Sequence, residues 1–315
     1  MDGVLTGFGI VLILIAIGFA AAVLLPGQTP AMQKGLTPAI YYITNPALMF
    51  ILLAETDLGA VVGVFTPIAL ITAAVAGGVF ALLSRFVLRR SAAQTAVGAM
   101  GSSYVNAGNI GLPIALYAVG SSTPVVSVLL AQLLVVAPIY LALFSWCTRR
   151  ASAEPAGGRT GWMAGTVRSL ANPVTVATAA GALFAGSGWT LPEVLWTPIE
   201  MLGHATIPLL LVLFGMGLHG QKPLAERSVR SDVLVSLAVK LVLMPAVAWA
   251  IGHLVFGVSG TALFGVVVMA ALPTAQNVYL FSAQFRMPVT AARDVIFLSS
   301  MLSLPVIGVI ALLLT

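Results

Sequence analysis

Charged residues are scarce in this sequence. Only 7% of its 315 residues are Asp, Glu, Lys or Arg, whereas 60% are hydrophobic. A soluble domain carries about 25% charged residues to cover its surface, so a water-soluble fold is excluded. Apolar stretches long enough to cross about 30 Å of hydrocarbon recur along nearly the whole chain. The composition therefore predicts an all-α membrane protein without a separate soluble domain.

Cysteine and the common catalytic motifs are also nearly absent. Cys147 is the single cysteine, so no internal disulfide forms, and neither Cys147 nor His204 has the spacing of a metal site. There is no His-Glu-x-x-His, no paired aspartate motif, and no membrane-deep His or Asp to activate Ser102 or Ser103. A P-loop is missing as well, so any energy comes from an ion gradient or a solute gradient. We expect no enzyme and no cofactor.

A basic stripe and a targeting segment are missing too. The formal net charge is +5, but the 14 Lys and Arg residues occur singly or in twos between apolar spans, so no nucleic-acid partner is expected. Asp2 is the only charge before Lys34, and the apolar run from Val4 to Leu25 is too long for a signal-peptide core. That run is therefore kept as the first span in the lipid bilayer.

Apolar runs between charged, Gly and Pro residues predict ten membrane spans. Lys and Arg are retained on the cytoplasmic side, and all of them except Lys240 fall in odd-numbered loops. The even-numbered loops and the termini hold only acids. We therefore expect a multi-pass protein of the cell (inner) membrane with both termini on the extracytoplasmic side. The expected spans are 4–25, 36–54, 60–84, 92–118, 123–146, 169–188, 194–218, 231–256, 259–285 and 291–314.

Five spans, a basic linker and five more spans suggest an internal repeat. An odd number of spans per repeat places the two copies in opposite orientations in the membrane. Similar segments support the duplication, with Ala107-Gly108-Asn109 in the first half and Ala275-Gln276-Asn277 in the second. We expect a first five-helix repeat over 1–146, a cytoplasmic linker over 147–168 and an inverted second repeat over 169–315.

The fourth and ninth spans are unusually rich in Gly, Pro and amide residues. Residues 102–113 read SSYVNAGNIGLP, and residues 271–277 read ALPTAQN. Pro removes a backbone donor and Gly tolerates non-helical angles, so both helices are expected to unwind and cross near the middle of the membrane. Unwound backbone is tolerated in hydrocarbon only where it lines a cavity or meets polar partners.

The expected consequence of two unwound helices is a binding site for an anion. Two half-helix N-termini, each worth about half a positive charge, would converge from opposite sides and attract a carboxylate. Alternatively, Gly and Pro are simply common in membrane helices and the amides bond neighbouring helices. For Asn45 and Gln132 both interpretations stay open. The candidate substrate-binding residues are Asn45, Asn106, Asn109, Gly111, Pro113, Gln132, Pro273, Gln276 and Asn277.

These motifs resemble the auxin efflux carrier family, which contains the plant PIN-formed carriers and bacterial malonate and malate permease-like proteins. The resemblance rests on residues 106–113, on residues 272–277 and on Lys240 followed by Pro245, and it extends over essentially the full length. It implies a 5+5 inverted repeat with two crossed discontinuous helices, a fold shared with bile acid symporters and sodium/proton antiporters.

The resemblance also implies how such a protein moves. A transport domain of helices 3, 4, 5, 8, 9 and 10 would move like an elevator against a scaffold of helices 1, 2, 6 and 7, and a homodimer would form through the scaffold helices. Unlike the plant carriers, this chain has no long hydrophilic cytoplasmic loop. Regulation by phosphorylation of such a loop is therefore not expected, and the resemblance does not specify auxin as the solute.

Lys240 is the one basic residue expected inside the membrane. It follows Asp232 by eight residues, which at 1.5 Å per residue places it about 12 Å into the membrane. A cation at the helix centre costs about 2.5 to 3.5 kcal/mol, so the side chain should face a cavity or bond the opened backbone of the fourth or ninth span. Lys240 either replaces or releases a coupling cation, H⁺ or Na⁺, or only supports the crossing helices.

The function predicted from these features is secondary active transport of a small organic anion, a carboxylate. One alternative is an ion-coupled carrier of a larger amphipathic anion, as the bile acid symporters are. A channel fits less well because channels usually build their filters by oligomeric symmetry, and an intramembrane enzyme fits less well because its motifs are missing.

Overall fold

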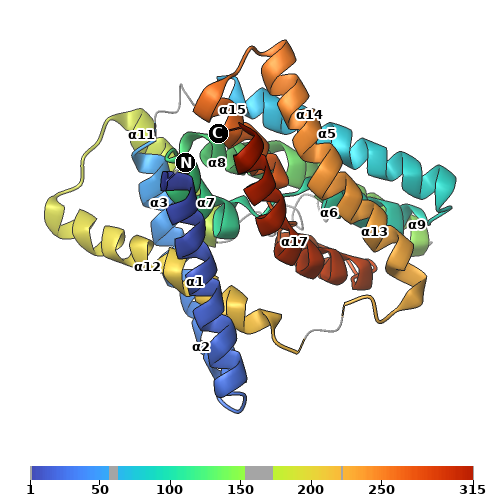
Figure 1. Ribbon diagram of the computed structural model, residues 1–315, viewed down its shortest axis with the longest axis horizontal. Coiled ribbons are helices and arrows are strands. Elements are labelled where there is room, and N and C mark those ends of the chain that lie inside the picture. Colours follow the sequence, from blue (N-terminus) through green and yellow to red (C-terminus); the bar gives the residue numbers. More distant parts are fainter. Residues whose placement is uncertain (1, 57–62, 153–172, 221–222, 315) are drawn as a thin grey trace. The chain divides into compact units, whose positions relative to one another are not determined.

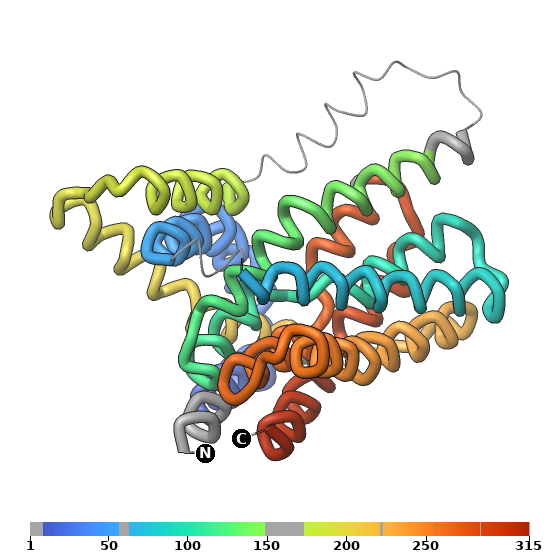
Figure 2. The backbone as a smooth tube through the Cα atoms, turned by 90° about the horizontal axis from the view of Figure 1, so that it is seen from above, coloured from blue at the N-terminus to red at the C-terminus, as the bar shows by residue number. Residues whose placement is uncertain are grey.

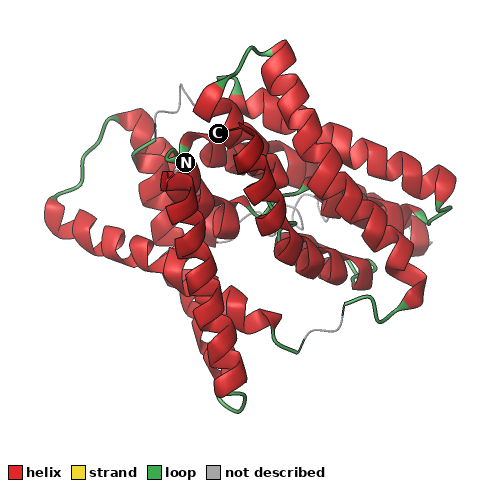
Figure 3. Cartoon of the chain, viewed as in Figure 1, coloured by secondary structure: helices red, strands yellow, loops and turns green. Residues whose placement is uncertain are grey.

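The computed structural model describes residues 2–56, 63–152, 173–220 and 223–314 (Figure 1). The described residues are 84% helical, and no β-strand element occurs among them (Figure 3). The all-α prediction is therefore confirmed. Of the linker expected over 147–168, the first residues continue a helix that ends at Ser152, and the remainder lies outside the described part of the chain.

Helices dominate because a chain in hydrocarbon must satisfy its backbone N–H and C=O groups internally. Several helices contain a π-helical turn, labelled η, which arises where one extra residue is accommodated. The elements are α1 (Asp2–Leu24), α2 (Thr29–Ala39), η1 (Ile40–Thr44), α3 (Asn45–Ala54), α5 (Phe65–Leu82), η2 (Leu83–Val87), α6 (Ala92–Ser103), η3 (Ala107–Gly111), α7 (Leu112–Ile114), η4 (Ala115–Val119), α8 (Thr123–Ala131), η5 (Gln132–Val136), α9 (Ala137–Ser152), α11 (Pro173–Ser187), α12 (Glu193–Leu218), the 3₁₀ turn η6 (Arg227–Val229), α13 (Arg230–Ala238), η7 (Val239–Leu243), α14 (Met244–Ala250), η8 (Ile251–Val255), α15 (Gly260–Ala271), α16 (Asn277–Gln284) and α17 (Thr290–Leu314).

Each expected span overlaps a helix or a pair of helical segments. By length and composition alone, six continuous helices in the described residues are able to cross a membrane. The count of ten spans, the inverted repeat and the orientation of the termini stay predictions. The six long helices are Thr29–Ala54, Phe65–Val87, Thr123–Thr148, Glu193–Leu218, Arg227–Val255 and Thr290–Leu314.

Several basic residues that were expected in loops lie within helices instead. Lys34 lies in α2, Arg85 in η2 and Arg293 in the first turn of α17. The apolar runs mark only the hydrocarbon-embedded part of a helix, whereas long basic side chains allow its polar ends to continue into water. The helices therefore extend a few residues beyond the runs from which they were predicted.

The chain divides into two compact units, and each unit combines segments from both halves of the sequence. Unit 1 comprises residues 1–62, 109–126 and 171–221. Unit 2 comprises residues 63–108, 127–170 and 222–315.

In unit 1, glycines allow α1 and α12 to pack with their backbones in direct contact (Figure 1). A Cβ atom on Gly18 would overlap the backbone carbonyl of Val212, and a Cβ atom on Gly215 would overlap that of Ile15. Small residues at such positions are typical of membrane helix pairs, because van der Waals contact drives the association there. Gly18 of α1 and Gly215 of α12 thus each allow the backbone of the other helix to approach closely.

We expect Gly18→Val to destabilise the protein strongly. The added side chain has no space against the α12 backbone. Overpacking of a well-packed interior typically lowers the free energy of unfolding by about 1 to 3 kcal/mol. The measurement is thermal unfolding of the purified protein in detergent. Gly9→Val is the matched control, because it lies in the same helix and a Cβ atom there meets nothing within 4 Å. Equal unfolding temperatures of the two variants would contradict this packing.

In unit 2, α5 packs against α6 and against the long helix formed by α13, η7, α14 and η8 (Figure 2). The ring of Phe80 fills the space above Gly98, so α5 and α6 approach closely. Val233, Leu237 and Leu241 of the long helix form a buried apolar cluster with Val295 of α17. This packing holds the helices that flank the helix breaks described below.

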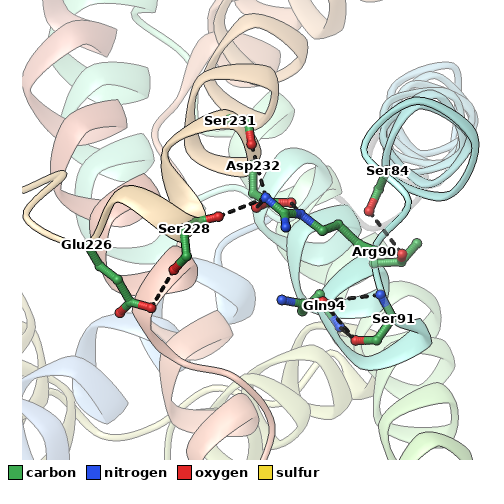
Figure 4. Close-up of polar contacts among 9 residues, drawn as sticks. Ser84, Arg90, Ser91, Gln94, Glu226, Ser228, Ser231 and Asp232 are labelled. Carbon is green, nitrogen blue, oxygen red and sulfur yellow. Dashed lines mark hydrogen bonds and ion pairs between the residues drawn. The ribbon is translucent and has the colours of Figure 1, made fainter.

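A polar cluster fastens the loop before α6 to the start of α13 (Figure 4). Arg90 donates from Nε to Oδ1 of Asp232 at 3.0 Å, and its Nη2 lies 2.8 Å from Oδ2. Nη2 also donates to the carbonyl of Ser228 at 2.8 Å and to Oγ of Ser231 at 3.1 Å. One charge-assisted hydrogen bond and one close ion pair join Arg90 to Asp232, so the α5–α6 hairpin and α13 are held together at this end of unit 2.

Candidate functional site

The first helix break lies in the fourth expected span. Helix α6 begins with a capping box at Ser91 and Gln94 and ends at Ser103. Tyr104 then takes an extended conformation, with φ −94° and ψ 108°, and helical turns resume at Ala107. Residues 104–106 are called the first opened segment.

The second helix break lies in the ninth expected span. Helix α15 ends at Ala271, and Leu272 is extended with φ −57° and ψ 150°. Proline disfavours the helical conformation of the residue before it, which explains why the helix stops ahead of Pro273. Helix α16 begins at Asn277. Residues 272–276 are called the second opened segment.

The two opened segments, both in unit 2, pair with each other. Val105 and Thr274 form an isolated antiparallel bridge. Asn106 N–H donates to the carbonyl of Pro273 at 2.8 Å, and Ala275 N–H donates to the carbonyl of Tyr104 at 3.1 Å. Backbone groups released from two helices thus satisfy one another, which is the condition for non-helical backbone at membrane depth.

Side chains complete the hydrogen bonds of the paired segments. The N–H of Val105 donates to Oε1 of Gln132 at 2.6 Å, and the N–H of Thr274 donates to Oγ of Ser299 at 3.0 Å. The hydroxyl of Thr274 donates to the carbonyl of Gly101 at 2.6 Å, near the end of α6. Buried N–H groups without partners are costly, and these contacts remove that cost.

Lys240 lies close to the second break. It belongs to η7, it is 0% exposed, and its Nζ contacts the carbonyl of Ala270 at 3.3 Å and Sδ of Met244 at 3.0 Å. Ala270 is the penultimate residue of α15, where the helix dipole is negative, so an amine is favourable there. The ion pairs found in the described part of the chain do not involve Lys240.

The predicted site residues divide between the two units. Unit 2 holds Asn106, Gln132, Pro273, Gln276 and Asn277, in or beside the paired segments, and unit 1 holds Asn45, Asn109, Gly111 and Pro113.

The side chains of the unit 2 group differ in exposure. Gln276 is exposed and Asn106 and Asn277 are partly exposed, whereas Pro273 and Gln132 are buried. Asn277 directly follows the second opened segment as the first residue of α16. The polar surface at the pairing is therefore formed by amides that come from both breaks.

The residues of the unit 1 group have different surroundings. Asn109 is partly exposed, while Gly111 and Pro113 are buried in the helical turns η3 and α7. The expectation that Gly111 and Pro113 lie in unwound backbone is wrong, because proline is tolerated in the first turn of a helix, where its missing N–H costs nothing. Asn45 is buried at the start of α3, and its Oδ1 has no hydrogen-bond partner in the described residues.

Three residues that contribute to the pairing were not predicted as site residues. Thr274 lies within the motif of the ninth span, and Tyr104 within that of the fourth. Ser299 lies in α17, where Ser299, Ser300 and Ser303 interrupt an apolar helix. A polar residue inside an apolar span was the signal that identified Gln132, and the same signal was available for Ser299.

The arrangement offers hydrogen-bonding groups and a helix N-terminus, not metal chemistry. No group of three or more His, Cys, Asp or Glu able to hold a metal is present among the described residues. Helix α16 starts at the pairing with Asn277 as its first residue, and the first N–H groups of a helix favour negative charge. The geometry is suited to holding a polar or anionic group reversibly.

The sequence matches a known protein family over nearly its whole length. A family model described as membrane transport protein matches residues 5–311, and thus both opened segments. No curated protein matches the chain at a significant level.

Proposed function

The chain belongs to the membrane transport protein family, the auxin efflux carrier family that its motifs resemble, and from this premise we propose that it is a secondary active carrier of a small organic anion. Membership makes it a multi-pass membrane transporter and argues against the enzyme alternative. We propose a small carboxylate as the solute, an elevator-type mechanism and coupling to H⁺ or Na⁺. The observation that carries it is the pairing of the two opened segments, with partly exposed amides beside them.

Paired helix breaks support a binding site because they need outside hydrogen bonds that a continuous helix would not need. A continuous helix would satisfy its own backbone, whereas the breaks at residues 104–106 and 272–276 depend on bonds from several side chains. Broken helices with amides at membrane depth are the usual solution for binding a solute in secondary transporters. Asn106 and Asn277 are the amides of unit 2 that we assign to the solute.

Electrostatics support an anion rather than a cation. The N-terminus of α16 presents the positive end of its dipole at Asn277, and Lys240 brings an amine to the neighbouring end of α15. The hydrogen bonds that hold the two opened segments are made to carbonyl, amide and hydroxyl groups. A carboxylate is the anion that matches amide and N–H donors best.

The division into two units supports alternating access of the elevator type. Unit 2 contains both opened segments and Lys240, so the groups that we assign to solute and ion coupling in this unit move together if the unit moves as a body. Unit 1 contains α1, α2, α3, α11 and α12, the helices that we assign to the scaffold, together with residues 109–126 from the fourth and fifth expected spans. The coupling ion is H⁺ or Na⁺, with Lys240 as the group that responds to it.

A larger amphipathic anion is the second candidate solute. It is suggested by the crossed discontinuous helices that the family resemblance implies, because bile acid symporters share that architecture. A channel is less compatible with the structure, because both breaks lie in one chain and pair with each other.

The proposal is tested with purified protein in two steps. A thermal-shift screen with mono- and dicarboxylates and one bile acid, with and without sodium at two pH values, identifies ligands that bind the folded state. Uptake of each labelled ligand into proteoliposomes is then measured over a range of concentrations. We expect saturable uptake of a small carboxylate. Stabilisation only by the bile acid would favour the second candidate, and uptake that does not saturate would indicate a channel.

A further inference from the structure

Two backbone N–H groups at the centre of the pairing bond to side chains instead of backbone. Val105 N–H donates to Gln132 Oε1 at 2.6 Å, and Thr274 N–H donates to Ser299 Oγ at 3.0 Å. Both bonds are buried. Val105 and Thr274 are the bridge residues themselves, so these two bonds hold the point at which the segments meet.

The two bonds correspond in their place along the chain. Gln132 lies in η5 of the expected fifth span, and Ser299 lies in α17 of the expected tenth span, so each belongs to the span after the one that contains its opened segment. The neighbouring N–H groups of Asn106 and Ala275 bond across to the opposite segment. Each opened segment therefore donates one N–H to its partner segment and one N–H to a side chain of the next span.

The hydroxyl of Ser299 is fully used in this arrangement. It accepts from Thr274 N–H and donates to the carbonyl of Ile296 at 3.2 Å, so its donor and one acceptor position are both occupied. The neighbouring Ser300 has the same residue type and is also buried, but its hydroxyl donates only within α17, to the carbonyl of Ile296 at 2.7 Å. Two adjacent serines thus differ only in whether they reach the opened segment.

We propose that Gln132 and Ser299 are a matched pair of positioning residues that fix the two opened segments and thereby place Asn106 and Asn277 for the solute. This proposal rests on the proposed function for its second half. Neither side chain needs to touch the solute, because each acts through a backbone N–H one residue from Asn106 or three residues from Asn277. Their roles are separable, since each side chain holds one segment.

The physical basis is the cost of an unsatisfied donor in a dry interior. Removing the acceptor leaves a buried N–H without a partner, and this loss is larger than the net value of the hydrogen bond. The segment is then expected to shift or open until the N–H finds another acceptor. A residue that keeps an oxygen at the same place should preserve the geometry.

Hydrogen exchange of the full-length protein in lipid nanodiscs tests this directly. Gln132→Leu should accelerate exchange at residues 104–106 by about tenfold or more and leave Thr274 and Ala275 near the wild-type rate, and Ser299→Ala should do the reverse. Ser300→Ala is the matched control and should change neither segment. Ser299→Thr retains the hydroxyl and should keep exchange slow at Thr274 and Ala275.

Two results would overturn the proposal. Unchanged exchange at both segments in Gln132→Leu and Ser299→Ala would show that the side chains do not hold them. Accelerated exchange throughout unit 2 would show a general contribution to stability instead of local positioning.

A transport assay tests whether Gln132 and Ser299 place Asn106 and Asn277 for the solute. With labelled malonate as the probe, each of the two variants should raise the half-saturation concentration about tenfold, while Ser300→Ala remains at the wild-type value. An unchanged half-saturation concentration together with a local change in exchange would overturn the placement of Asn106 and Asn277. If the wild-type protein fails to take up malonate or any carboxylate, the proposed function fails, and the exchange result still decides whether Gln132 and Ser299 hold the segments.

Discussion

Replacing Asn277 with alanine is expected to reduce transport about 100-fold or more while the protein remains folded and inserted. Asn277 is the first residue of α16, it is partly exposed, and its side chain lies beside the paired segments. Hydrogen bonds to a charged group contribute about 1.5 to 3 kcal/mol each, so losing one or two accounts for a change of this size. Initial uptake rates in proteoliposomes, normalised to inserted protein, provide the measurement.

Two further variants separate the possible causes of a loss in Asn277→Ala. Tyr104→Phe removes a hydroxyl from the first opened segment and should have a smaller effect, because the Asn277 amide itself is retained. Asn106→Ala removes the other amide that we assign to the solute, which is partly exposed in the first opened segment, and should also abolish transport. Wild-type rates in both asparagine variants would refute the assignment of the site.

Replacing Lys240 with methionine is expected to remove the ion dependence of transport without unfolding the protein. Lys240 is fully buried against a carbonyl and a thioether, and a buried amine carries a desolvation cost that an apolar side chain of similar volume avoids. The thermal unfolding temperature should therefore stay equal or rise. Uptake measured across pH and sodium concentration should become insensitive to the coupling ion.

The comparison with other substitutions decides what Lys240 does. Lys240→Gln keeps a polar group but no charge and should show the same loss of ion dependence. Lys34→Gln removes the charge of an exposed lysine and should leave the dependence intact. If both Lys240 variants retain the wild-type pH and sodium profiles, only a supporting role for α15 remains.

The sequence predicted the helices well because the bilayer imposes a strong local rule. Any apolar stretch of sufficient length must be helical, so apolar runs and charge spacing were enough to locate the long helices of the described residues. The exact ends were less predictable, as Lys34 and Arg85 show, because hydropathy reports the hydrocarbon boundary and not the last hydrogen bond. The π-helical turns leave no signal in composition and were not anticipated.

Of the two helix breaks, the sequence located the second accurately and the first only approximately. Pro273 marks the second break, since proline acts on its immediate neighbour. The first break precedes Gly108 and Pro113 instead of including them, because its position is set by bonds to Pro273 and Gln132. Contacts between residues so far apart in sequence depend on the assembled unit, and the same holds for Ser299.

The bridge between Val105 and Thr274 also constrains how the protein is made. The ribosome delivers the first partner long before the second, and at about 5 to 20 residues per second the delay is on the order of ten seconds. During that interval residues 104–106 have neither Pro273 nor Ala275 to bond, so the insertion machinery must shield an unfinished polar turn. Biogenesis of this chain is therefore expected to depend on an insertase that retains the early helices until the last ones arrive.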